Sequence, residues 1–337
     1  MYHLLVDWKR NNEFFLERGF REQGLDLTIH DIPNYSVADR TAKLGFINLY
    51  YKYIKLCFKA IKASKKNDIL ICWNFTTSIA CAYLCKLFAQ QRTILALNII
   101  APPRKKVGEF IRRRVFSPVM NGSRYFITIN SEFIITDYSI RFKVKKWKFF
   151  VLNDPMQEVE IKEFNNSGDY VFIGGEGQRD WGNLFEACSK IPEIKFLCIA
   201  RRKYFDHVKE IPANVRMLFD TDSDTFYNHM AKSKLVAIPL KSLAPAGLIV
   251  LLRAAMMNKP VIATDTPSIR NYIENDKSGI LVTLGNSKEL AEKIVMLFNN
   301  SDLQKLYASN LLRYVKQNFT HKNYTETLVK ILNDIRP

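Results

Sequence analysis

Short apolar runs alternate along the whole chain with segments whose apolar residues recur every three or four positions. The first pattern predicts strands and the second predicts helices. The predicted strands cover residues 2–6, 25–30, 68–72, 93–99, 124–129, 147–152, 170–173, 195–199, 215–218, 235–238, 261–264 and 279–282. The predicted helices cover residues 13–23, 47–63, 78–88, 107–116, 131–141, 179–191, 247–257, 269–273, 286–299, 302–317 and 322–332, the fifth of them capped by Ser131. This alternation predicts an α/β fold with parallel sheets.

A polar, acidic stretch at residues 153–168 interrupts the alternation and predicts a linker. It separates a first domain, residues 1–152, from a second domain, residues 169–316, and a C-terminal helix, residues 317–337. The 337 residues suffice for two domains of ordinary size.

Two glycine turns of the second domain lie between a predicted strand and a predicted helix. One is Pro245-Ala246-Gly247, before helix 247–257, and the other is Gly174-Gly175. The first N–H groups of a helix have no partner within the helix, so such a turn can bind an anion, here the diphosphate of a nucleotide. Arg179 can place a bidentate charge on it. The plainer alternative is a glycine turn that caps an ordinary helix.

These segments resemble the donor-sugar-binding signature of the glycosyltransferases of GT-B architecture, above all the large retaining family (group 1, or family 4-like) of bacterial surface-polysaccharide pathways. The chain keeps Lys259-Pro260-Val261-Ile262-Ala263-Thr264 and the Gly279–Val282 strand of that signature. The resemblance implies two facing Rossmann-like domains with parallel sheets and a C-terminal helix that crosses back to the first domain. Pro245 and Arg253 stand where the family has two glutamates, which contact the donor sugar and the ribose.

The predicted donor site combines the glycine turns with nearby cations. Arg201 ends a strand, where it reaches either the nucleotide or only solvent, and Arg253 in place of a glutamate suits an acidic donor or a phosphate. The predicted donor-binding residues are Gly174, Gly175, Arg179, Arg201, Ala246, Gly247 and Arg253.

We expect neither a metal ion nor a cofactor, with a nucleoside-diphosphate sugar as co-substrate. Asp220-Thr221-Asp222 has the spacing of a metal-binding motif, but it more simply forms a turn and caps a helix at Thr225. The six cysteines form no zinc pattern and are expected to be buried, reduced thiols, as in a cytosolic protein.

The catalytic base is the least defined part of the site. Relatives in the family often carry a histidine where Asn98 stands, and an amide cannot accept a proton. Asp7, just past the first strand, and Glu132 are the carboxylate candidates if the reaction inverts configuration. The catalytic candidates are Asp7 and Glu132, together with Asn98 because it stands at the position of the family histidine.

The positive charge is concentrated in the first half of the chain. Residues 1–150 hold 26 Lys and Arg against 11 Asp and Glu, whereas the rest holds 24 against 22. Helix 107–116 places apolar residues on one face with arginines beside it, as in helices that lie on anionic membranes. The predicted membrane or acceptor contacts are Arg104, Lys105, Lys106, Arg112, Arg113 and Arg114. An amphipathic helix that packs on its own domain is the alternative.

No apolar stretch is long enough to span a membrane, and the N-terminus does not have the pattern of a signal peptide. We therefore expect a cytoplasmic protein, peripheral at the inner face of the cell membrane.

The expected activity is that of a metal-independent, hexosyltransferase-like enzyme. It moves a sugar from a nucleoside-diphosphate donor to a lipid-linked saccharide or another glycan. Two alternatives stay open. The missing glutamates and histidine fit a catalytically reduced paralogue that acts as a binding or scaffold subunit. The basic charge fits a nucleic-acid-binding protein, although no nucleic-acid-binding module is recognised and no nucleic acid is expected as a partner.

Overall fold

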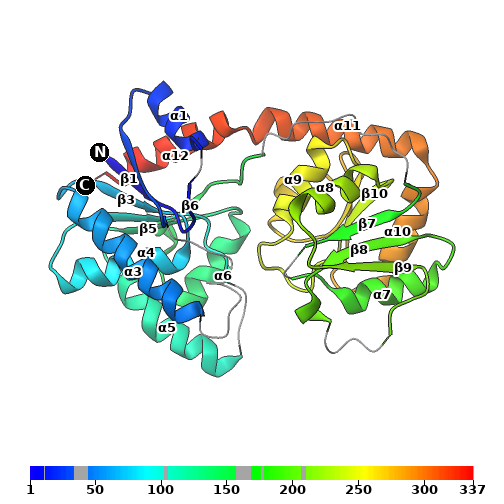
Figure 1. Ribbon diagram of the computed structural model, residues 1–337, viewed down its shortest axis with the longest axis horizontal. Helices are drawn as coiled ribbons and strands as arrows, with labels where there is room; N and C mark the ends of the chain where they lie inside the picture. Colours follow the sequence, from blue (N-terminus) through cyan, green and yellow to red (C-terminus); the bar gives the residue numbers. More distant parts are fainter. Residues whose placement is uncertain are drawn as a thin grey trace. The chain divides into compact units, whose positions relative to one another are not determined.

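The computed structural model describes residues 1–10, 12–33, 45–101, 105–156, 168–175, 178–205 and 210–336. The chain divides into two compact units. The first contains Met1–Asn153 and His321–Pro337, and the second contains Asp154–Thr320. Each unit holds one six-stranded sheet, and every strand pair in both sheets is parallel (Figure 1). The predicted α/β class with parallel sheets is confirmed.

The sheet of the first unit has the order β2-β1-β3-β4-β5-β6. Its strands are β1 (Tyr2–Leu5), β2 (Leu27–His30), β3 (Ile69–Cys72), β4 (Thr93–Ala96), β5 (Tyr125–Ile129) and β6 (Phe149–Val151). The α-helices are α1 (Phe15–Glu22), α3 (Gly45–Ala63), α4 (Phe75–Leu87), α5 (Lys106–Met120), α6 (Phe133–Phe142) and α12 (His321–Asp334). The last of these helices comes from the C-terminus, so the chain returns to its first unit at His321.

Two separate hydrophobic cores lie on the two faces of this sheet. Helices α3, α4, α5 and α6 form one core with it, and α1 and α12 form the other (Figure 1). Helix α12 packs closely against α1 at Gly19, because a Cβ on Gly19 would lie 2.6 Å from the Thr325 Oγ1.

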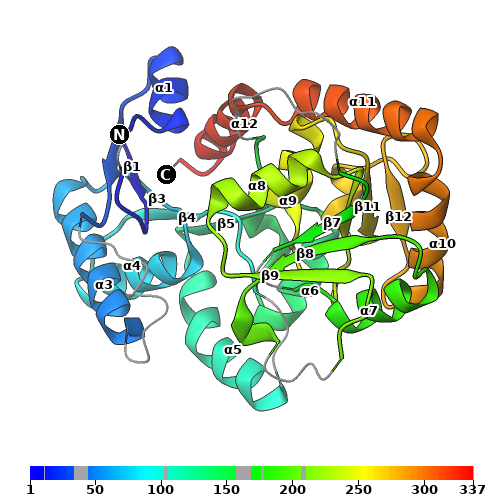
Figure 2. The same cartoon turned by 45° about the vertical axis from the view of Figure 1, so that its right-hand side comes forward.

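The sheet of the second unit has the order β12-β11-β10-β7-β8-β9. Its strands are β7 (Val171–Gly174), β8 (Phe196–Ala200), β9 (Val215–Phe219), β10 (Leu235–Ile238), β11 (Val261–Thr264) and β12 (Ile280–Val282). Its α-helices are α7 (Trp181–Lys190), α8 (Ser223–Lys232), α9 (Leu248–Met256), α10 (Ser287–Phe298) and α11 (Ser301–Asn318). Helices α7 and α10 cover one face, and α8 and α9 cover the other (Figure 2).

Both sheets contain a point where the direction of strand addition reverses. In the second unit it lies between β7 and β10, because β8 and β9 follow on one side of β7 while β10, β11 and β12 follow on the other. In the first unit it lies between β1 and β3. Loops diverge at the carboxyl ends of the strands there and leave a crevice, which is the usual ligand site of such sheets.

The Lys259–Thr264 segment is held at both ends of β11, and only its Thr264 end borders the crevice. Lys259 Nζ, which is buried, donates to the Ser233 carbonyl at the end of α8, 2.7 Å away. Thr264 Oγ1 at the end of β11 accepts from the Leu240 N–H at 2.8 Å, just past β10. The segment thus fixes the end of one helix and the start of the loop that leads to Gly247.

Most predicted elements are present, and three local predictions are wrong. Strand β4 ends at Ala96 rather than at residue 99, because Asn98 adopts a φ of 38° that no strand allows. Helix α6 begins at Phe133, and Glu132 rather than Ser131 occupies its cap position. Trp147 lies in a 3₁₀ turn, Lys146–Lys148, ahead of β6. Most of the predicted linker, residues 157–167, lies outside the described residues.

All six cysteines are buried and none forms a disulfide, as predicted. Burial raises the pKa of the Cys85 thiol to about 11, so the group stays protonated near neutral pH. In the part of the chain that the structure describes, no helix is long and apolar enough to cross a membrane.

Candidate donor-binding site

Arg179 lies at the reversal point of the second sheet, between the two predicted glycine turns. Its Nε donates to the Gly174 carbonyl at 2.9 Å, at the end of β7. A Cβ on Gly175 would lie 2.7 Å from the Arg179 Nη2, and a Cβ on Gly247 would lie 3.6 Å from Nη1. The guanidinium therefore fills the space between both turns, which the sequence separates by some seventy residues.

The two glycines are required by backbone conformation as well as by space. Gly175 has a φ of 134° and Gly247 a φ of 82°, values that side chains rarely allow. Gly247 also packs against β10, since a Cβ there would lie 2.7 Å from the Ile238 Cγ2. No other residue fits either position without strain.

Helix α9 starts at Gly247 without a side-chain cap. Among the described residues, the other α-helices of the second unit each begin with a capping side chain: Asp180 in α7, Asp222 in α8, Asn286 in α10 and Asn300 in α11. Only α9 leaves its first N–H groups without such an acceptor, and it does so beside Arg179. The end of a helix that carries free N–H groups and a positive dipole attracts an anion.

Arg179 is buried, with 5% of its surface exposed. Burial lowers the pKa of its guanidinium to about 10, because the charged form loses hydration there. No ion pair offsets this cost within the described part of the chain. A buried cation of this kind is stabilised when an anion binds, and its planar N–H groups suit a phosphate or a diphosphate.

Hydrogen bonds from neighbouring loops hold the turn after β7. Gln178 has a φ of 61°, and its carbonyl accepts from the Lys241 N–H at 3.0 Å. Its side-chain Oε1 accepts from the Ser242 hydroxyl at 3.0 Å. These partners escaped the sequence prediction, because nothing in a Gln-Arg or Lys-Ser dipeptide indicates that the loops after β7 and β10 meet.

The other predicted donor residues lie on the elements around this turn. Ala246 is half-buried in the turn before α9. Arg201 follows β8 and lies 3.8 Å from the Asp220 carboxylate. Arg253, in the last turn of α9, stacks over the Tyr227 ring at 4.8 Å from its centroid. The structure thus brings Gly174, Gly175, Arg179 and Gly247 together, whereas Arg201 and Arg253 contact Asp220 and Tyr227.

Asp222 caps α8, as predicted. Its carboxylate accepts from the Thr225 N–H at 2.7 Å and from the Thr225 hydroxyl at 2.9 Å. Among the described residues, no group of three or more His, Cys, Asp or Glu side chains is placed to hold a metal ion.

Asp7 lies at the reversal point of the first sheet. It follows β1, is buried, and accepts from the Tyr53 hydroxyl of α3 at 3.2 Å. Trp8 and Trp73, which follow β1 and β3, pack edge to face with ring centroids 5.4 Å apart. Both indoles are partly exposed, so an aromatic surface borders this crevice. The sequence analysis missed both tryptophans, whose only signal is their place directly after two strands.

The other catalytic candidates do not lie beside Asp7. Glu132 is exposed after β5, which is three strand spacings, or about 14 Å, from β1. Asn98 Oδ1 accepts from the Thr128 hydroxyl at 3.1 Å, and the Asn98 N–H donates to the same hydroxyl at 2.8 Å. The Asn98 side chain therefore holds the turn after β4 against β5.

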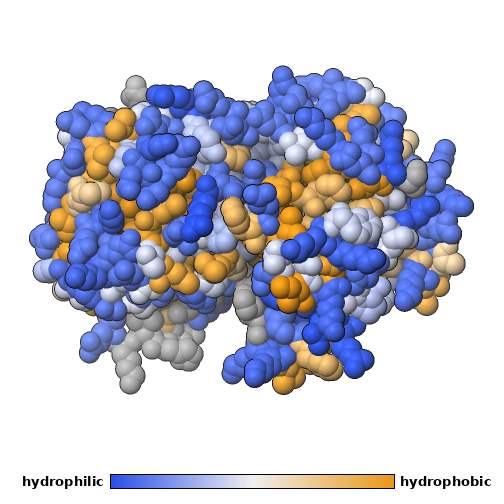
Figure 3. Space-filling view, turned by 180° about the vertical axis from the view of Figure 1, so that it is seen from behind, coloured by the Kyte–Doolittle hydropathy of each residue, from blue (hydrophilic) through white to orange (hydrophobic). Residues whose placement is uncertain are grey.

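The basic helix α5 has an exposed apolar face, although one predicted contact is wrong. Val107, Phe110 and Ile111 are exposed, and Figure 3 shows hydrophobic residues beside strongly hydrophilic ones on this side of the first unit. Lys105, Lys106 and Arg114 are also exposed, and Arg113 is half-buried. Arg112 instead points inward, is 7% exposed, and pairs with Glu109 at 3.1 Å. Arg104 lies outside the described residues.

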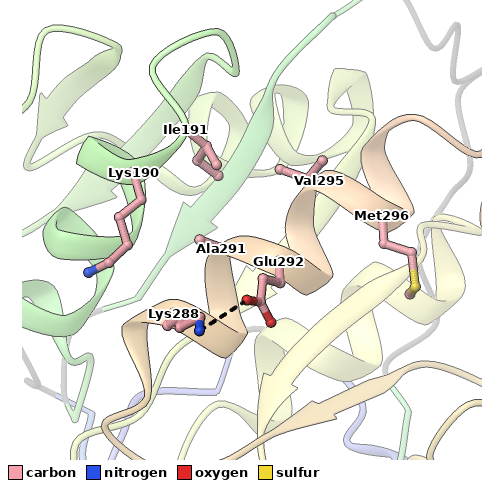
Figure 4. A pocket seen from close by; sticks show the side chains of 7 residues that line it. All are labelled: Lys190, Ile191, Lys288, Ala291, Glu292, Val295 and Met296. Carbon is pink, nitrogen blue, oxygen red and sulfur yellow. Dashed lines mark ion pairs between the residues drawn. The ribbon is translucent and has the colours of Figure 1, made fainter.

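A separate depression lies between α7 and α10 (Figure 4). It is lined by Lys190, Ile191, Lys288, Ala291, Glu292, Val295 and Met296. These residues come from the sides and ends of helices rather than from the carboxyl ends of strands. Lys288 and Glu292 form an ion pair at 4.0 Å, so their charges already neutralise each other. We therefore place no ligand there.

Residues 170–300 match the family model described as glycosyl transferases group 1. The match contains β7, the Arg179 turn, Gly247 and the whole of α9. This part of the chain, which holds the candidate donor site, is therefore similar to a group 1 glycosyltransferase domain. An uncharacterized glycosyltransferase of Methanocaldococcus jannaschii is 26% identical over 161 residues. That match spans 45% of this chain and 45% of the relative, so less than half the length of the relative is covered.

Solved structures extend the likeness to both units of the chain. Anabaena HepE in complex with UDP aligns with a TM-score of 0.70 and 16% identity, over 99% of this chain and 100% of the other. A Rickettsia africae glycosyltransferase aligns with a TM-score of 0.69 and 16% identity, over 99% and 98%. The lipopolysaccharide outer core galactosyltransferase WaaB aligns with a TM-score of 0.65 and 16% identity, over 99% of both chains. The fold is therefore GT-B, as the resemblance implied.

Proposed function

We propose that the protein is a glycosyltransferase that binds a nucleoside-diphosphate sugar in the second unit, with the diphosphate against Arg179 and the start of α9. One observation carries the proposal. A buried arginine that forms no ion pair with any described residue lies between Gly175 and Gly247, beside the one uncapped helix start among the described α-helices of that unit. The HepE structures, which contain UDP, glucose or UDP-glucose, favour the same class of donor.

The proposed chemical role of this site is to stabilise the nucleoside diphosphate as the leaving group. An acceptor hydroxyl oxygen forms a bond to the anomeric carbon, while the bond from that carbon to the diphosphate oxygen breaks. The electron pair goes to the diphosphate, where Arg179 and the N–H groups of α9 stabilise the new charge. This proposal uses no metal ion and no cofactor.

The acceptor is proposed to bind at the crevice of the first unit. Asp7 is the favoured base among the three candidates, because it follows β1 at the reversal point and Trp8 and Trp73 border the same crevice. Aromatic side chains supply a large apolar surface with a polar N–H, which suits the ring of a sugar. The hydroxyl proton passes to the Asp7 carboxylate if the reaction inverts configuration.

A lipid-linked saccharide or another glycan is the proposed acceptor class. The excess of Lys and Arg in residues 1–150 and the exposed apolar face of α5 favour peripheral binding to an anionic membrane on the cytoplasmic side. The protein would then bind the same membrane that contains its lipid-linked acceptor.

A thermal-shift screen over UDP-, GDP-, CMP- and dTDP-sugars, followed by assays for donor hydrolysis and transfer, tests the proposal. At least one nucleoside-diphosphate sugar is expected to raise the unfolding temperature, with CMP-sugars as the monophosphate control. Failure of every diphosphate donor to stabilise the protein would remove the basis of the proposal.

A catalytically reduced paralogue is the second candidate. It is favoured by Pro245 and Arg253, which stand where relatives have two glutamates, and by the engagement of Asn98 with Thr128. Tight donor binding without hydrolysis or transfer to any acceptor would support this candidate against the enzyme.

A further inference from the structure

Helix α3 presents a continuous apolar face to the outside of the first unit. The residues of this face are Ile47, Tyr50, Tyr51, Ile54 and Phe58. Tyr51 is 64% exposed and Ile47 is 57% exposed, and all five rank among the exposed large hydrophobic side chains of the described residues. The membrane prediction rested on the positive charge of residues 1–150 and on helix 107–116, and it did not use the apolar face of α3.

The spacing of these residues forms a single stripe. At about 100° per residue, the five positions fall within an arc of roughly 100° along about 17 Å of the helix. The opposite side of α3 is the one that packs on the sheet, through Tyr53, Leu56 and Cys57. The stripe is therefore not a part of the core that happens to be uncovered, because α3 already has its own buried side.

The end of α4 extends the apolar surface. The Phe58 and Phe88 rings lie 5.5 Å apart between centroids, and Phe88 is 50% exposed. Leu87, beside it, is the most exposed large hydrophobic residue of the described chain, at 74%. We call Ile47, Tyr50, Tyr51, Ile54, Phe58, Leu87 and Phe88 the α3 surface.

The two chain segments that carry the α3 surface have charges of a single sign. Residues 45–67 and 75–92 contain no Asp or Glu. They contain the lysines 52, 55, 59, 62, 65, 66 and 86 and Arg92. On the helix, Lys55, Lys59 and Lys62 follow one border of the stripe by the same spacing rule, and all three are exposed.

The exposed apolar side chains and the lysines beside them together indicate what kind of partner covers the α3 surface. A second copy of the chain meeting the same face would bring the lysines of both copies together, and neither segment of the α3 surface supplies a carboxylate to pair with them, which is unfavourable. An anionic lipid bilayer offers an apolar interior to the isoleucines and phenylalanines, an interfacial layer that tyrosines prefer, and negative headgroups to the lysines.

We propose that the α3 surface docks the first unit on an anionic lipid bilayer, with the stripe lying in the plane of the interface. The inference deepens the membrane part of the proposed function and moves its main contact from α5 to α3. It does not depend on glycosyl transfer, because no residue of the α3 surface belongs to the donor or catalytic candidates.

Vesicle co-sedimentation of the full chain tests the proposal. The probe is phosphatidylcholine vesicles with roughly one third phosphatidylglycerol, compared with phosphatidylcholine alone. The wild-type protein is expected to sediment with the anionic vesicles, and Tyr51→Ser with Ile54→Ser is expected to weaken binding about tenfold or more. Lys55→Gln with Lys62→Gln should remove most of the preference for anionic lipid and flatten the salt dependence.

Met296→Ser with Leu306→Ser is the matched control, because both side chains are exposed and apolar but lie in the second unit. It is expected to bind vesicles like the wild type. A thermal unfolding curve and a UDP titration of each variant show that folding and the donor site are intact, so loss of nucleotide binding with vesicle binding retained would reject the proposed function alone.

Three results would overturn the inference. Failure of anionic vesicles to retain the wild-type protein would reject a bilayer as the partner of this surface. Equal binding by the wild type and the Tyr51/Ile54 variant would show that the α3 surface is not the contact. A wild-type dimer in solution that becomes monomeric in this variant would assign the face to a second copy.

Discussion

Among the described residues, Arg179 is held by a backbone carbonyl and by close packing rather than by an opposite charge. Its Nε is fixed on the Gly174 carbonyl, and its two terminal nitrogens border Gly175 and Gly247. A lysine can supply the charge at this place but not the planar fork that bonds a carbonyl and a phosphate at once.

Arg179→Lys is therefore expected to weaken nucleoside-diphosphate binding by roughly 10- to 100-fold, the range of one or two charge-assisted hydrogen bonds. Isothermal titration calorimetry of the wild type and the variant measures this difference. Arg216→Lys, an exposed position in the same unit, is the control and should bind like the wild type. Equal affinity of Arg179→Lys and wild type would show that the diphosphate binds elsewhere.

His30 is a buried group whose protonation state the fold restricts. His3 Nδ1 lies 3.0 Å from His30 Nε2, and His3 Nε2 lies 3.2 Å from the Asp68 carboxylate. Burial first, and then the charges of His3 and Lys59, lower the pKa of His30 to about 4. The folded protein keeps His30 neutral where the unfolded chain, with a pKa near 6.5, already binds a proton.

The free energy of unfolding should therefore fall as the pH falls from about 6.5 toward 4. The contribution of His30 is about 2 kcal/mol between neutral pH and about pH 5. Urea unfolding of the wild type and of His30→Gln at both pH values measures it, and the variant should lose less stability on acidification. The same pH dependence in both proteins would assign the effect to other groups.

At the scale of elements, the start of α9 couples backbone strain to the donor site. Gly247 has a φ of 82° and approaches Ile238, whereas Gly285 has a φ of 73° and no heavy atom within 4 Å of a Cβ. Gly285→Ala thus isolates the cost of the left-handed backbone, which is about 1 kcal/mol.

Gly247→Ala should cost more than Gly285→Ala, by roughly 1–2 kcal/mol, because β10 must also yield to the new methyl group. It should weaken nucleotide binding as well, since α9 shifts relative to Arg179. Chemical denaturation and a UDP titration of both variants test this. A Gly247→Ala protein that binds UDP as tightly as the Gly285→Ala protein would show that the start of α9 does not contribute to nucleotide binding.

The far end of α9 carries Arg253, where relatives have a glutamate that contacts the ribose. Its guanidinium stacks on Tyr227, and we expect it to favour an acidic donor or a phosphate. Arg253→Glu should then weaken donor binding, by about tenfold for the loss of a charge-assisted contact, in the same titration. An unchanged affinity would contradict this role.

At the scale of the whole molecule, alternating strands and helices were sufficient to predict both sheets. Buried parallel strands such as β7, β10 and β11 are continuous apolar runs, which makes them visible in the sequence. Backbone geometry was less visible: the φ of Asn98 that ends β4 early depends on its hydrogen bonds to Thr128, thirty residues away.

The candidate site was predictable where glycines mark a backbone requirement and unpredictable where distant loops meet. Gly175 and Gly247 could be singled out, and so could Arg179. Only the structure shows that Arg179 lies against both turns and that Arg112 points inward toward Glu109. Trp8 and Trp73 become neighbours only because β1 and β3 pair.

Hydrogen exchange of the full chain, with and without a nucleoside diphosphate that stabilises it, tests the central claim most directly. We predict slower exchange of the backbone amides in the turn after β7, around residues 174–179, and in the first turn of α9, around residues 247–251. The amides that line the α7 and α10 depression should be unaffected. Protection confined to that depression or to the first unit, with none at the start of α9, would contradict the account.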